Sequence, residues 1–221
     1  MTLLSTSDPA ATAEAEAAGG ADRGRQIIEA AYELLDEAGL EGLTIRAVLK
    51  RTGLSRRAFY ERFSGKDDLV LAVFEQTIRR AADYFAEQAR PVSDPLEQLR
   101  LIVLSIVLTR TDVGGEVVQE TNRRGAALSR EHLRLAESRP EELQAALRPL
   151  IELIARLLAE GMAAGVVRDY APQRLAALVY NLVSTTMHTE LLAQETAQPD
   201  PARRAQLAEE IWEFCRRAIA A

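Results

Sequence analysis

One short segment of the chain concentrates side chains that can bind nucleic acid. Residues 42–66 carry seven basic side chains and a single acidic one, Glu61. The basic side chains belong to Arg46, Lys50, Arg51, Arg56, Arg57, Arg62 and Lys66. An arginine guanidinium can pair with the O6 and N7 atoms of guanine, and either basic residue type can neutralise a phosphate. The segment therefore favours DNA as a partner.

Two capping residues predict that this segment forms a helix-turn-helix. Thr44 can cap a short helix that Gly53 ends, and Ser55 can cap a second short helix. In such a motif the second helix lies in the major groove, and its first residues reach the base edges. The exposed backbone N–H groups at both helix starts also attract phosphate.

The second short helix has an inward and an outward face. Phe59 and Phe63 are four residues apart and share the face that packs on a small core. Arg56, Arg57 and Tyr60 lie on the outer face. A basic run can be no more than a solvated helix surface, but the caps and the aromatic core favour DNA binding. The predicted DNA contacts are Thr44, Arg46, Ser55, Arg56, Arg57, Tyr60 and Lys66.

The overall charge at first argues against nucleic acid. The 221 residues include 27 Lys and Arg against 33 Asp and Glu, which gives a net charge of −6. Because residues 42–66 contribute +6, the rest of the chain carries −12. DNA would repel this acidic remainder, so contact is expected through the basic segment alone.

Composition and periodicity both predict an all-α protein. Ala, Leu, Glu and Arg are abundant, whereas aromatic residues make up only 5% of the chain. Apolar residues recur at helical spacing, with Gly or Pro between the segments. Ser64 followed by Asp67 has the spacing of a capping box. The predicted helices cover residues 23–38, 45–51, 56–63, 66–89, 95–110, 116–137, 140–164, 172–194 and 201–220.

The first residues and the single cysteine bear on the compartment. Residues 1–20 contain no Lys or Arg, which a secretory signal peptide requires, and we predict a disordered arm there. No apolar stretch approaches the roughly 20 residues of a membrane-spanning helix. Cys215 alone excludes an intramolecular disulfide and favours a reducing compartment. We therefore expect a cytoplasmic protein.

Enzymatic chemistry finds little support in the sequence. The two histidines, His132 and His188, are 56 residues apart, and no His-x-x-x-His or Cys-x-x-Cys spacing for a metal is present. No Gly-rich phosphate loop occurs either. Cys215 lies in a predicted packed helix, which favours an inert core thiol. We expect neither an enzyme nor a bound metal or other cofactor.

The basic segment resembles the DNA-binding signature of the TetR family of transcriptional regulators. The matching residues are Thr44, the Gly53-Leu54-Ser55 turn, Tyr60-Glu61-Arg62-Phe63 and Lys66-Asp67-Asp68-Leu69. Residues 23–38 fit the family's first helix, and residues 160–169 fit the end of its seventh. Two positions depart from the family, which often has a small residue where Leu49 stands and Gly where Arg57 stands.

The resemblance implies a homodimeric repressor that binds a palindromic operator and is released by a small-molecule effector. It implies a helix-turn-helix domain over 21–67 and a helical effector-binding and dimerisation domain over 68–221. Family dimers pair through their last two long helices, here 172–194 and 201–220. An activator or a ligand-independent global regulator is the alternative within DNA binding. From the residues alone, a helical dimerisation module without specific DNA binding is a further alternative.

Helical spacing indicates candidate residues for dimerisation and for effector binding in the domain over 68–221. The candidate dimer-interface residues are Leu175, Val179, Leu182, Val183, Leu207, Ile211 and Phe214. A second stripe on the helix over 172–194 consists of Leu178, Asn181, Thr185 and His188. The candidate effector contacts are Tyr84, Phe85, Val103, Val107, Met162, Asn181 and His188. Residues of these types at helical spacing are more often core, so the chemical class of the effector stays open.

Overall fold

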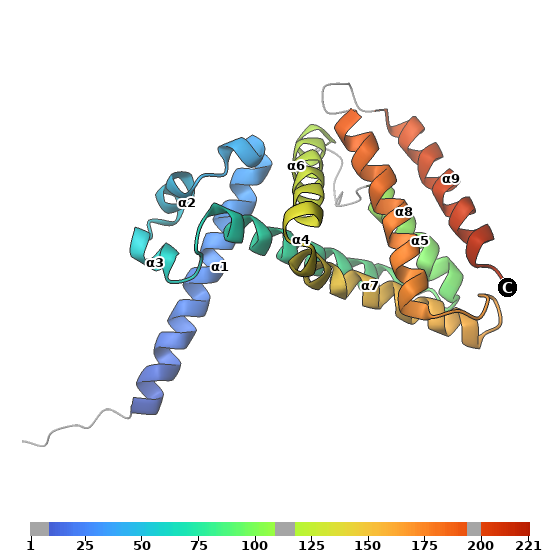
Figure 1. Cartoon of the computed structure of the whole chain (residues 1–221), viewed down its shortest axis with the longest axis horizontal. Helices are drawn as coiled ribbons and strands as arrows, with labels where there is room; N and C mark the ends of the chain where they lie inside the picture. The colour runs from blue at the N-terminus through green and yellow to red at the C-terminus, as the bar shows by residue number, and fades with distance from the viewer. Residues whose placement is uncertain (1–8, 109–117, 194–199) are drawn as a thin grey trace, which may run out of the picture. The chain divides into compact units, whose positions relative to one another are not determined.

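The computed structural model describes residues 9–108, 118–193 and 200–221, and its regular elements are all helices (Figure 1). This confirms the all-α prediction. The helices are α1 (Pro9–Gly42), α2 (Ile45–Thr52), α3 (Arg56–Tyr60), α4 (Lys66–Ala89), α5 (Pro95–Leu108), α6 (Val118–Ser138), α7 (Pro140–Ala163), α8 (Pro172–Ala193) and α9 (Pro201–Ile219). Among the described helices, none has the length and apolarity needed to cross a membrane.

The chain divides into two compact units, with the boundary between Val73 and Phe74. We call the unit up to Val73 the head and the unit from Phe74 onward the body. The sequence predicts the boundary six residues earlier, between residues 67 and 68. Helix α4 begins in the head and continues without a break into the body.

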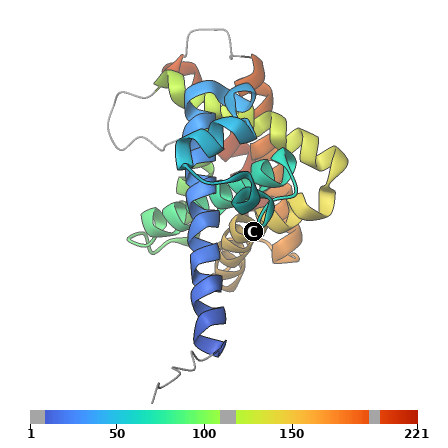
Figure 2. The ribbon, with the colours of Figure 1, turned by 90° about the vertical axis from the view of Figure 1, so that its left-hand side faces the viewer.

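The head is built from α1, α2, α3 and the start of α4. Helices α2 and α3 pack against α1, which Figure 2 shows in blue with the two short helices beside it. The largest fully buried side chains of the head are Ile27, Leu35, Leu43, Val48, Phe59 and Leu69. These apolar residues come from all four helices and from the α1–α2 connection, and together they form the core that fixes α2 and α3 on α1.

The predicted caps of the two short helices are confirmed. The Thr44 hydroxyl accepts the backbone N–H of Ala47 at 3.1 Å, and the Ser55 hydroxyl accepts that of Ala58 at 3.2 Å. Gly53 ends α2 in the left-handed conformation with φ 70°, which glycine adopts without strain. These local signals place the turn between the two helices where the sequence predicts it.

Two local predictions need correction. Helix α3 ends at Tyr60 rather than at residue 63, because the backbone turns there and both Arg62 N and Phe63 N donate to the Phe59 carbonyl. Asp68, not Asp67, accepts from the Ser64 amide at 3.1 Å and from the Ser64 hydroxyl. The reason is that α4 begins at Lys66, which makes Asp68 the third helical residue.

The first helix is longer than the sequence predicts. Helix α1 begins at Pro9, so residues 9–20 are helical where a disordered arm was expected, and residues 1–8 lie outside the described part. The segment is rich in Ala and Glu, which have high intrinsic helix propensity. Gly39 interrupts the helix with φ 63°, at the position where the sequence predicts the end of the first helix.

In the body, α7 packs against α5, α6 and α8, and α5 packs against α7, α8 and α9. The apolar helix α5 buries Leu99, Ile102, Val103 and Val107, as expected of a helix surrounded by others. The predicted end of this helix at 109–110 lies outside the described residues. Helix α7 ends before Gly165, which has φ 70°. After that turn, the chain forms an isolated β-bridge between Val167 and Ala220.

Candidate nucleic-acid interface

An aromatic cluster anchors the outward face of α3. The Phe59 side chain is completely buried, and its ring centroid lies 5.3 Å from that of Tyr60 and 5.5 Å from that of Phe63. The Tyr60 ring meets Phe59 edge-on at 85°, yet Tyr60 is 54% exposed. Tyr60 therefore packs one side on the core and presents its hydroxyl to solvent.

The basic side chains of α3 face solvent, as the sequence predicts. Arg56 and Arg57 are both exposed, and the Arg57 Nε donates to Glu61 Oε1 at 2.9 Å. The Arg57 side chain remains 90% exposed in this pair. Because an exposed ion pair contributes little free energy, the guanidinium can exchange Glu61 for a base edge or a phosphate.

The capping hydroxyls and Arg46 lie at the helix starts. Thr44 and Ser55 use their oxygen atoms to accept backbone N–H groups, so each keeps its own hydroxyl hydrogen to donate. Both residues are exposed, as is Arg46 in the first turn of α2. A phosphate oxygen is an acceptor that such hydroxyls and a guanidinium can bind.

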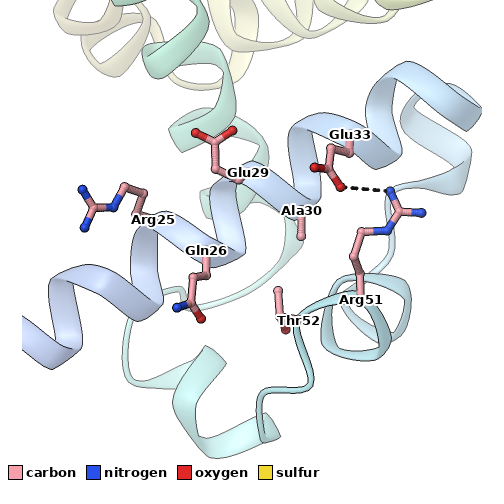
Figure 3. A pocket seen from close by; sticks show the side chains of 7 residues that line it. All are labelled: Arg25, Gln26, Glu29, Ala30, Glu33, Arg51 and Thr52. Carbon is pink, nitrogen blue, oxygen red and sulfur yellow. Dashed lines mark hydrogen bonds and ion pairs between the residues drawn. The ribbon is translucent and has the colours of Figure 1, made fainter.

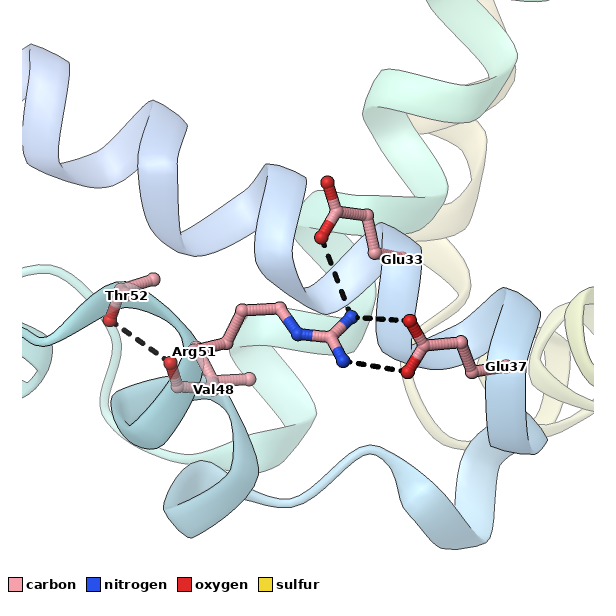
Figure 4. A network of polar contacts seen from close by, with 5 residues as sticks. All are labelled: Glu33, Glu37, Val48, Arg51 and Thr52. Carbon is pink, nitrogen blue, oxygen red and sulfur yellow. Dashed lines mark hydrogen bonds and ion pairs between the residues drawn. The ribbon is translucent and has the colours of Figure 1, made fainter.

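Arg51 has a different role from the other basic residues. Its guanidinium donates to both carboxylate oxygens of Glu37, at 2.8 and 2.6 Å, and to Glu33 at 3.4 Å (Figure 4). This fork ties the last turn of α2 to α1. The hydrogen bonds lower the pKa of the Glu37 carboxyl and raise the pKa of Arg51. Glu33 and Glu37 are one helical turn apart on α1, so both carboxylates face the same guanidinium.

Lys66 also makes a contact inside the head. Its Nζ donates to the Leu40 carbonyl at 2.8 Å, close to the end of α1. The ammonium has two further N–H groups, so a phosphate contact remains a prediction. Removal of the Lys66 side chain would therefore have a second effect, because the Leu40 carbonyl would lose this hydrogen bond.

A shallow concavity of about 430 Å³ lies between α1 and α2. Figure 3 shows its lining residues, which are Arg25, Gln26, Glu29, Ala30, Glu33, Arg51 and Thr52. Arg25 pairs with Asp22 at 2.9 Å, and Arg51 is held by the clamp. Because its walls carry charges of both signs, this concavity lacks the continuous positive surface that a DNA backbone requires.

The structure disperses the candidate effector contacts in the body. Phe85, Val103 and Val107 are buried, and Tyr84, Met162 and His188 are partly buried. Asn181 is exposed on α8, so its role in effector binding stays a prediction. His188 lies against His132, a residue for which the sequence predicts no role in a site. No local spacing could have paired them, because they lie on different helices.

The candidate dimer residues also separate into two groups. Leu175, Val179 and Val183 on α8, and Ile211 on α9, are buried within the single chain. Helix α8 packs on α5, α6 and α7, and α9 packs on α5. Leu182 and Leu207 are partly buried. Phe214 on α9 and Leu178 on α8 are 63% and 55% exposed.

Comparisons with known proteins agree with this geometry. Residues 27–73 match the family described as bacterial regulatory proteins of the tetR family. The chain is 35% identical over 82 residues to the HTH-type transcriptional regulator BetI 1 of Chromohalobacter salexigens, covering 37% of this chain and 41% of that protein. It is 37% identical over 65 residues to the HTH-type transcriptional repressor AcnR of Corynebacterium diphtheriae, covering 29% and 34%. The chain thus aligns with less than half the length of these two relatives.

The body is matched at the level of fold. The crystal structure of the transcriptional regulator FadR from Bacillus subtilis, in complex with stearoyl-CoA, superposes with a TM-score of 0.64 at 17% identity, covering 86% of this chain and 96% of that one. The helix-turn-helix head with its capped helices and outward arginines carries the sequence match, and the helical body completes the same fold. Residues 27–73 thus match the tetR family of bacterial regulatory proteins, and the chain as a whole has the same fold as FadR.

Proposed function

We propose that this protein is a transcriptional repressor that binds a palindromic DNA operator as a homodimer and leaves it when a small molecule binds the body. The observation that carries the proposal is the outward face of α3, where Arg56, Arg57 and Tyr60 stand exposed over the buried Phe59. A helix of this kind can enter the major groove with its first residues on base edges. The AcnR and FadR relatives support the repressor and effector parts of the proposal.

Selection of bound fragments from random DNA, followed by titration over a salt series, tests this function. A specific regulator should enrich a palindrome, and its log Kd should change steeply with log salt, by about 0.9 per neutralised phosphate. Equal affinity for all sequences, or a response flat in salt, would favour a helical dimerisation module without specific DNA binding.

The two arginines at the helix starts should differ in their effects on DNA binding. We expect Arg56→Ala to cost about 1–3 kcal/mol on the selected operator and to relax preference at one base pair. We expect Arg46→Ala to weaken binding to all sequences alike and to reduce the salt slope by about one. Fluorescence anisotropy on the operator and on scrambled DNA measures both effects. Identical profiles for the two variants would contradict these roles.

The exposed apolar residues of α8 and α9 give the proposed dimer a specific test. Phe214→Glu should place a charge in the interface without disturbing the core, because the Phe214 side chain is 63% exposed within one chain. We expect this variant to sediment as a monomer at micromolar concentration. Leu133→Glu on α6, where the leucine is 47% exposed, is the matched control and should remain a dimer. A dimeric Phe214→Glu protein would exclude this face.

A further inference from the structure

The two histidines of the chain meet in the body. His132 on α6 and His188 on α8 have ring centroids 4.4 Å apart, with the rings tilted by 57°. The rings of Phe74 on α4 and Tyr180 on α8 lie 6.0 and 6.3 Å from His132. Tyr180 hydrogen-bonds to the Ser184 side chain, and both Phe74 and Tyr180 are buried. The histidine pair is thus the polar part of an aromatic cluster.

One atom of this cluster lacks a hydrogen-bond partner. His132 Nδ1 is buried, and no group in the described part of the chain hydrogen-bonds to it. An unsatisfied buried polar atom is unfavourable, so such atoms are rare in native proteins and require an explanation. Whichever tautomer His132 adopts, Nδ1 is either a donor without an acceptor or an acceptor without a donor.

Charged residues close in sequence to the two histidines pair with other charged residues. On α6, Arg134 donates to both oxygens of the buried Glu131, at 2.9 and 2.6 Å. On α8, Glu190 pairs with Arg203 at 3.7 Å. Burial lowers the pKa of His132, and burial together with His132 lowers the pKa of His188 to about 4. Both imidazoles are therefore neutral near pH 7.

A metal ion does not suit this pair. Within the described ranges, no group of three or more His, Cys, Asp or Glu side chains is placed to hold a metal. Two imidazoles alone fall short of the three or four protein ligands of an ordinary zinc site. An organic ligand with a hydrogen-bonding group is chemically better suited to a histidine pair beside aromatic rings.

We propose that the His132–His188 pair is the polar end of the effector site and binds the carboxyl group of a small organic acid. This inference rests on the proposed function, which places effector binding in the body. A carboxyl group satisfies either tautomer of His132, because a carboxylate accepts from Nδ1–H and a carboxylic acid donates to a bare Nδ1. In the second case the acid proton moves to Nδ1 and leaves a carboxylate–imidazolium pair. Such charge-assisted bonds are about twice as strong as neutral ones.

Nuclear magnetic resonance of the full chain without DNA tests the proposal directly. The two histidines give one Cε1–H resonance each, and replacing either residue assigns them. Benzoate is the probe, with benzyl alcohol and benzylamine as neutral and cationic analogues of matched size. We expect benzoate to shift both resonances saturably at pH 7, and the two analogues to leave them in place. An equal response to benzyl alcohol, or none to benzoate, would overturn the proposal.

Substitution of His132 provides the second arm. His132→Phe keeps a ring in the cluster but removes Nδ1, and we expect it to weaken benzoate binding at least about tenfold. Leu133→Ala, at the exposed neighbouring position, is the control and should bind like the original protein. Equal binding by His132→Phe would overturn the proposal. If that variant does not fold, the comparison of benzoate with benzyl alcohol on the original protein decides alone.

The two hypotheses can fail separately. A protein that binds its selected operator but not benzoate would refute the carboxyl site and leave the proposed function intact. A protein that binds benzoate through His132 but shows no sequence-specific DNA binding would refute the proposed function instead. DNA affinity and benzoate affinity are therefore measured on the same preparation.

Discussion

Phe59→Ala is expected to lower the free energy of unfolding of the head by about 3–5 kcal/mol. Phe59 is completely buried, and its ring contacts those of Tyr60 and Phe63. Alanine would remove this shared centre and leave a cavity beneath α3. A unit as small as the head rarely has more than about 3–5 kcal/mol of stability from its core. The loss should therefore unfold most of the head and abolish DNA binding.

Hydrogen exchange resolves this effect because it reports on each helix. We expect the amides of α2 and α3 to lose protection in Phe59→Ala, while those of α7 in the body stay protected. Tyr60→Phe is the matched control, since it keeps the ring against Phe59 and removes only the exposed hydroxyl. That control should fold normally and affect DNA affinity alone. If the amides of α3 kept their protection in Phe59→Ala, the Phe59 ring would not be what holds α3 on the core of the head.

The head could be predicted in detail because its signals are local. Thr44, Gly53 and Ser55 each act within three or four residues of themselves, and the structure shows all three where the sequence predicts them. The exception among the basic residues is Arg51. Its partner Glu37 is 14 residues away on another helix, so charge counting alone could not separate a clamp from a DNA contact.

In the body, the contacts between helices could not be predicted from the sequence. Helix α8 carries two apolar stripes, and helical spacing alone cannot tell which one is core. The packing of α5, α6 and α7 decides it, burying Leu175 and Val179 and leaving Leu178 exposed. His132 and His188 meet for the same tertiary reason. Contacts between distant helices depend on how the helices cross, which one sequence does not encode in any local spacing.

Acid is expected to destabilise the body through the same histidine pair. The pKa of His188 in the folded protein is about 4, against about 6.5 in an unfolded chain. Between these values the unfolded state binds more protons than the folded state, so stability falls as pH falls. The loss begins near pH 6.5 and is complete below about pH 4. A difference of this size corresponds to about 3 kcal/mol.

Urea unfolding of the body at pH 7.5, 5.5 and 4 measures this loss. His132→Phe/His188→Phe removes both titrating rings while keeping aromatic side chains in the cluster, and we expect a flatter stability profile from it. Carboxyl groups also titrate in this range, but they are common to both proteins, so the difference between the two profiles isolates the histidines. Parallel profiles would mean that the pair is solvated and titrates alike in both states. They would also remove the premise that His132 and His188 are neutral when a carboxyl ligand arrives.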